Sequence, residues 1–227
     1  MNNDGLLLYI PPKTAVELFF LSKIDLSMQW PKGQAERFFD ILLSTPILDI
    51  LSTIDYATHT ESLMTEEMPQ FAEAPDVLYS AVATVCNCGK EAVSYEDLGY
   101  YLIREDRKPL AYRKYGENYG KGASYLGLLC YKPGRFYKSA LSNAYIDFLT
   151  TEQRKKLQTI LLLRIPLIQE LLWKARESKY NGYDSMRMFS KSTMLRRGQC
   201  PRWMMTALHR LKDAELDKRI NNVFWQE

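Results

Sequence analysis

Apolar side chains recur at steps of three and four residues through the first third of the chain. This period is typical of amphipathic helices. Examples are Phe38, Ile41 and Leu42, then Leu48, Leu51 and Ile54. Two short helices are expected to meet at Thr45-Pro46, because proline disfavours helical backbone at the residue before it. The pattern predicts an acidic helical region over residues 1–75, closed by a linker at Met64–Pro75 that is poor in large apolar residues.

The middle of the chain has a different order of elements. A helix is predicted over Asp76–Val85, and a second begins at Ser94, which can cap it with Asp97 three residues on. A third helix is expected over Leu110–Leu128, followed by two short strands around the turn Pro133-Gly134. Three helices followed by a basic hairpin is the order of a winged helix, which we predict for residues 76–150.

The last third is helical again. We expect a long amphipathic helix over Glu152–Lys179, bent at Pro166, because proline interrupts the helical hydrogen bonds. A break at Gly198 then separates two further helices, the second over Pro201–Lys212. This arrangement predicts a second helix-turn-helix-like unit in residues 151–227. The predicted fold class is therefore mainly α.

The third predicted helix has two different faces. At helical spacing, one side carries the residues expected to pack inward: Tyr115, Tyr119, Ala123 and Leu126. The other side carries long polar groups: Arg113, Lys114, Glu117, Asn118 and Lys121. A helix that enters the major groove of DNA needs this division. Three glycines in the same helix each cost roughly 1 kcal/mol relative to alanine, which suggests a close approach of the helix backbone either to a neighbouring helix or to a phosphate strand.

The net charge of +3 hides a strong asymmetry. Residues 1–97 contain 5 Lys/Arg and 15 Asp/Glu, a balance of −10, and residues 98–227 contain 25 and 12, a balance of +13. A basic half rich in Tyr and Arg favours a polyanionic partner, most often nucleic acid. The acidic half would be repelled by that partner and suits a protein partner or solubility.

Basic side chains, together with the amide of Asn118, fall into three groups that could bind DNA. Direct readout of bases is assigned to Arg113, Lys114, Asn118 and Lys121. The hairpin contributes Lys132, Arg135 and Lys138, and a second cluster contributes Lys191, Arg196, Arg197 and Arg202. If about six of these side chains contact phosphates, the log–log salt slope of binding should lie near −5. The alternative is that both helical clusters are ordinary solvated surfaces.

The run Lys114–Leu129 (KYGENYGKGASYLGLL), with its short basic hairpin and Leu141-Ser142, resembles a winged-helix domain of bacterial restriction-modification and related defence proteins. The stretch Phe189–Trp203 is similar to a downstream Ser-x-Ser/Thr-x-x-Arg-Arg element of the same family. The resemblance covers about residues 76–212. It implies DNA binding, often as the specificity part of a larger enzyme.

Motifs for catalysis are not found in the sequence. Its two histidines have no spacing typical of a metal site or a nucleophile relay, and there is no phosphate-binding loop or dinucleotide fingerprint. A zinc site would require Cys86 and Cys88 to converge with Cys130 and Cys200. We therefore predict no catalytic residue, no metal and no cofactor.

These patterns favour a non-catalytic, sequence-specific DNA-binding protein, a recognition subunit or regulator in a restriction or defence context. A diverged restriction-type nuclease and a protein–protein adaptor are the alternatives. Double-stranded DNA is the expected partner, although structured RNA stays open, as do a protein partner for the acidic region and a homodimer. The scattered cysteines favour a cytoplasmic protein, and the apolar window Phe38–Ile54 contains charges and a proline that argue against a membrane span.

Overall fold

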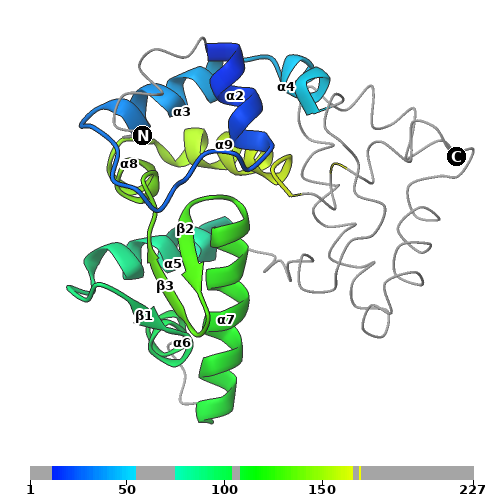
Figure 1. Ribbon diagram of the computed structural model, residues 1–227. Helices are drawn as coiled ribbons and strands as arrows, with labels where there is room; N and C mark the ends of the chain where they lie inside the picture. The colour runs from blue at the N-terminus through cyan, green and yellow to red at the C-terminus, as the bar shows by residue number, and fades with distance from the viewer. Residues whose placement is uncertain (1–11, 55–74, 104–107, 166–168, 170–227) are drawn as a thin grey trace, which may run out of the picture.

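The computed structural model describes residues 12–54, 75–103, 108–165 and Gln169. These residues form helices and one small three-stranded sheet, which confirms the predicted mainly α class. In Figure 1, helices α2, α3 and α9 form the upper part of the described structure. Helices α5, α6 and α7 and the sheet form the lower part.

The N-terminal helices follow the sequence pattern. They are α2 (Pro12–Phe20), α3 (Gln34–Ser44) and α4 (Ile47–Ile54). The predicted break between the last two is confirmed, since Thr45 has an extended backbone with φ −78° and ψ 127°. Helix α3 begins after Gly33, whose φ of +81° is a conformation that other residues rarely adopt.

The three helices predicted in the middle of the chain are confirmed as α5 (Pro75–Asn87), α6 (Tyr95–Leu102) and α7 (Pro109–Tyr125). Ser94 caps α6 as expected: its hydroxyl accepts a hydrogen bond from the backbone N–H of Asp97 at 3.0 Å. A two-residue strand, β1 (Val93–Ser94), precedes α6 and was not predicted. A strand this short carries no alternation that periodicity could detect.

The predicted hairpin is confirmed as β2 (Leu129–Lys132) and β3 (Arg135–Lys138), with Gly134 in its turn at φ +83°. Both pairings are antiparallel, and the strand order is β1-β3-β2. Strand β3 is central: it pairs with β2, its partner in the hairpin, on one side and with β1, which precedes α6, on the other. The order of elements along this part of the chain is helix, strand, helix, helix, strand, strand.

Two serines fasten the base of the hairpin to helix α8 (Ser142–Asp147). The Ser142 hydroxyl donates to the Leu128 carbonyl at 2.7 Å and accepts from the Ser139 N–H at 2.8 Å. The Ser139 hydroxyl donates to the Gly127 carbonyl at 2.9 Å. All of these groups are buried, so each bond satisfies a polar atom that water cannot reach.

Helix α9 (Thr151–Leu162) starts with a capping box between Thr150 and Gln153. The helix ends at Leu162, four residues before Pro166. The sequence had instead predicted a helix that continues through a bend at Pro166. A helix continued to Pro166 would bring its ring against the carbonyl of Leu162. The chain instead leaves the helix through a tight turn, in which the Ile165 N–H donates to the Leu162 carbonyl at 3.1 Å. The rest of the predicted helix lies outside the described residues.

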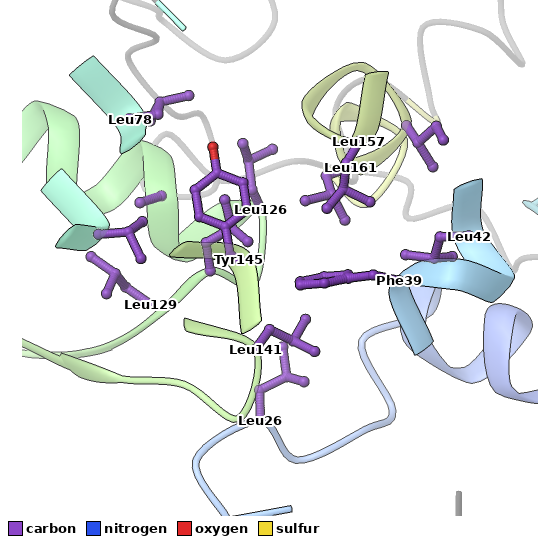
Figure 2. Packing of buried hydrophobic residues seen from close by; sticks show 14 of the residues in the cluster. Leu26, Phe39, Leu42, Leu78, Leu126, Leu129, Leu141, Tyr145, Leu157 and Leu161 are labelled. Atoms are coloured by element: carbon purple, nitrogen blue, oxygen red, sulfur yellow. The ribbon is translucent and has the colours of Figure 1, made fainter. Parts of the chain in front are cut away.

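One hydrophobic core runs through the described structure. Figure 2 shows Leu157 and Leu161 of α9 beside Phe39 and Leu42 of α3, with Tyr145 of α8 on the other side. The Tyr145 hydroxyl, which is buried, accepts a hydrogen bond from the Gln158 amide at 2.6 Å. Residues from all three predicted regions contribute to this core, and the boundaries near residues 75 and 150 stay a prediction.

Several expectations lie outside the described residues. They include most of the Met64–Pro75 linker, the second helix-turn-helix-like unit, and the cluster of Lys191, Arg196, Arg197 and Arg202. Within the ranges that are described, no helix combines the length and apolar character needed to span a membrane.

Candidate nucleic-acid interface

Helix α7 packs through its glycines. A Cβ atom at Gly116 would overlap the carbonyl oxygen of Tyr95 in α6, and one at Gly120 would overlap the ring of Phe136 in β3. In the same contact between the two helices, one turn away in each, Gly99 of α6 lies equally close to the carbonyl of Tyr112. The close approach suggested by the glycines is thus an approach to a neighbouring helix and strand.

This packing corrects the predicted inner face of α7. Ala123 and Leu126 are buried as expected and Tyr119 is partly buried against the core, but Tyr115 is 47% exposed, with its ring centroid 5.5 Å from that of Tyr119. The buried positions include Gly116 and Gly120 instead. The prediction was wrong for Tyr115, because Gly116 and Gly120 allow the backbone itself to make the contact with α6 and β3.

Basic side chains gather on α7 and the hairpin. Residues 108–138 contain seven Lys/Arg and one acidic residue, Glu117, a balance of +6. Six of the seven cations are exposed: Lys108, Arg113, Lys114, Lys132, Arg135 and Lys138. None of these six forms an ion pair with another residue in the described ranges. They are available to an anionic partner.

Lys121, the seventh cation, is held in a cluster. Its ammonium lies 2.7 Å from a carboxylate oxygen of Glu117, one helical turn earlier in α7. It also lies 5.9 Å from the ring centroid of Tyr95 and 5.6 Å from that of Tyr131, a geometry suited to cation–π attraction. Lys121 and Glu117 are each about one third exposed (34% and 36%), so the pair is fixed in place but reachable.

Tyr95 and Tyr131 join α6 to the hairpin beneath this lysine. Their rings are stacked, with the ring centroids 6.2 Å apart. The Tyr95 hydroxyl donates a hydrogen bond to the Tyr131 hydroxyl at 2.8 Å. Burial, together with this hydrogen bond, raises the pKa of Tyr95 well above its usual range. Tyr95 therefore stays protonated at any ordinary pH, and its hydroxyl remains the donor to Tyr131 of the hairpin.

Asp97 of α6 lies close enough to Arg135 of β3 for the charge of that arginine to act on its carboxyl group. Its pKa is lowered, first by a hydrogen bond from Lys90 at 3.1 Å, and also by Ser94 and the charge of Arg135. The carboxylate is consequently ionised at neutral pH. It is already paired with Lys90 and so leaves Arg135 available to an outside anion.

Arg164, from the turn after α9, caps the C-terminal end of α7. Its guanidinium donates to the Tyr125 carbonyl at 2.9 Å and lies 5.3 Å from the ring centroid of Phe19 in α2. Burial lowers the pKa of Arg164 to about 10. Arg164 therefore connects the C-terminus of α7 to both α2 and the turn after α9, and it is a structural residue.

Metal-binding clusters of three or more His, Cys, Asp or Glu residues are not found within residues 12–54, 75–103 and 108–165. Cys86, Cys88 and Cys130 are thiols without a disulfide. Burial raises the pKa of both Cys86 and Cys130, which disfavours the thiolate needed for metal binding or catalysis.

Seven of the residues predicted to bind DNA lie on α7 and the adjacent hairpin, namely Arg113, Lys114, Asn118, Lys121, Lys132, Arg135 and Lys138. Sequence reasoning did not single out Tyr95, Tyr131 or the pairing of Glu117 with Lys121. Only the last had a sequence signal, since acidic and basic residues four apart on a helix are expected to pair.

No family model, curated protein or solved structure matches the chain. The resemblance to winged-helix domains of defence proteins therefore stays a prediction from the sequence.

Proposed function

We propose that the chain is a non-catalytic, sequence-specific DNA-binding protein in which α5 to β3 form a winged helix. The order of elements and the strand order β1-β3-β2 support this proposal. In such a unit, α7 would enter the major groove and the β2–β3 hairpin would lie along the adjacent backbone.

The observation that carries the proposal is the balance of +6 over residues 108–138, with six of the seven cations exposed. Arg113 and Lys114 project from α7, and Lys132 and Arg135 flank the hairpin turn. Cations on two adjacent elements can contact phosphates on both sides of a groove, which fixes the orientation of the protein. Asn118 and Lys121, further along α7, would then reach base edges.

The resemblance to defence proteins supports a narrower role as a recognition subunit or regulator of a restriction system. The scattered cysteines support a cytoplasmic location. Both statements are part of the proposal.

Binding of a fluorescent duplex, followed by anisotropy over a range of salt concentrations, tests the proposed function. With about six phosphate contacts, log Kd should rise with log salt with a slope of about 5. The double variant Lys132→Ala/Arg135→Ala should weaken binding to every duplex alike and lower the slope by roughly 2.

A charge-matched control separates this surface from general electrostatic attraction. Lys32→Ala/Lys155→Ala also removes two exposed cations, but Lys32 lies just before Gly33, the N-cap of α3, and Lys155 lies on α9, and both helices are away from the hairpin turn (Figure 1). It should leave the affinity within about twofold. A flat salt response, or equal losses in the two double variants, would contradict the proposal.

A further inference from the structure

Glu117 is the one acidic residue in residues 108–138, where it lies among seven Lys and Arg residues. A carboxylate among cations would weaken phosphate binding through repulsion. It nevertheless lies one helical turn from Lys121, within 2.7 Å of its ammonium, on the solvent-facing side of α7. A surface that only binds phosphates would not require a carboxylate at this position.

The Glu117–Lys121 pair has more neighbours than an isolated surface ion pair, since two aromatic rings lie beside the ammonium. The rings of Tyr95 and Tyr131 fix the ammonium, and their mutual hydrogen bond fixes the rings. Exposed lysines normally lose side-chain entropy when they bind. Here much of that loss has occurred in the folded chain, so the two side chains present one donor–acceptor unit.

We infer that Glu117 and Lys121 together read one G·C base pair in the major groove, an inference that rests on the proposed function. A lysine ammonium has three N–H donors, and Glu117 takes one. Two remain for N7 and O6 of guanine, which are adjacent acceptors. The Glu117 carboxylate then accepts from N4 of the paired cytosine, which lies beside O6.

An A·T pair does not match this unit. Adenine places the N6 donor between its own N7 acceptor and O4 of thymine, so two lysine donors do not meet two adjacent acceptors. The thymine methyl group also occupies the space beside O4. Replacing the G·C pair by A·T should therefore lower the affinity about tenfold.

Selection from a library of randomised duplexes, with sequencing of the bound fraction, tests this inference. Wild-type protein should enrich one position as G·C. Glu117→Gln keeps the shape but removes the charge and adds amide donors, so discrimination at that position should fall from about tenfold to about threefold, the part that the Lys121 donors supply. Because the repulsion of phosphates is removed, its affinity for random duplexes should rise, and a purely structural role would not predict that combination.

Two lysine variants and one base analogue sharpen the test. Lys121→Arg should retain the guanine preference, and Lys121→Met should lose it. Replacing guanine at the enriched position by 7-deazaguanine, which lacks N7, should weaken the wild type but not Lys121→Met. Lys132→Ala should weaken all duplexes and leave the preference unchanged. Circular dichroism melts would establish that each variant is folded.

The possible failures are distinguishable. Salt-sensitive binding with the same base preference in wild type and Glu117→Gln would overturn this inference and leave the proposed function intact. Absence of binding to any duplex by the wild type would overturn both.

Discussion

The backbone of Gly116 in α7 lies directly against the carbonyl oxygen of Tyr95 in α6, and no side chain fits between them. This contact sets the distance between the two helices. The same tyrosine stacks on Tyr131 of the hairpin, so the packing of α6 on α7 also determines where the hairpin lies.

Gly116→Ala should therefore destabilise the fold by roughly 3 kcal/mol or more, since the overlap is with backbone that cannot rotate away. Gly122→Ala is the matched control in the same helix. A Cβ atom there would meet the Leu78 side chain at 3.5 Å, an ordinary contact. That change should be neutral or stabilise by up to about 1 kcal/mol, because alanine favours helix. Urea denaturation measures both, and equal midpoints would contradict the close approach.

Ser142→Ala tests the fastening at the base of the hairpin. The buried Ser142 hydroxyl serves the Leu128 carbonyl and the Ser139 N–H, and its loss leaves both with fewer partners. The expected cost is about 1–3 kcal/mol in the free energy of unfolding. Ser27→Ala is a suitable comparison, because Ser27 bonds only Asp25 on the surface and should change stability by less than about 0.5 kcal/mol.

Stability should fall at alkaline pH because of Tyr95. Its pKa is raised in the folded protein, so the folded state retains a proton that the unfolded chain loses near pH 10. The contribution is fully present below about pH 10 and is lost as the pH rises further. Tyr95→Phe should start from a lower stability and show a shallower decline between about pH 9 and 11. Identical slopes in chemical denaturation would contradict the assignment.

Cys86 and Cys130 should react slowly with iodoacetamide at pH 8. Burial raises the pKa of both thiols, which reduces the reactive thiolate, and it also limits access of the reagent. Unfolding in urea should make both sites react at the rate of an ordinary thiol. Peptide mass spectrometry after timed labelling follows each cysteine separately. Rapid labelling of either cysteine in the folded protein would contradict the burial of its thiol.

The sequence was sufficient to predict helices α5, α6 and α7 and the β2–β3 hairpin in their observed order, but not strand β1. Thr45-Pro46, the Ser94 cap and Pro133-Gly134 are local signals, and each marks an observed boundary. Their reliability has a physical basis, since proline, glycine and capping side chains act on the backbone within a few residues. The end of α9 was missed because the effect of Pro166 reaches back four residues, to Leu162.

The candidate interface was predictable only in part. The cations of α7 and the hairpin follow from their positions in the sequence, but the inner face of α7 does not. Periodicity counts apolar side chains, and Gly116 and Gly120 have none, so Tyr115 was placed inside by mistake. The contacts of Lys121 with Tyr95 and Tyr131 join residues far apart in the chain and depend on tertiary packing.

The first turn of α7 contains no acidic residue, and Lys108 at its N-cap makes no capping hydrogen bond through its side chain. Helices usually place acids there, because the aligned peptide dipoles leave partial positive charge at that end. Lys108 and the nearby Arg113 and Lys114 add to that charge, which costs the isolated protein stability. A polyanion laid across this end would relieve the repulsion, so an excess of duplex DNA is expected to raise the melting temperature of the chain.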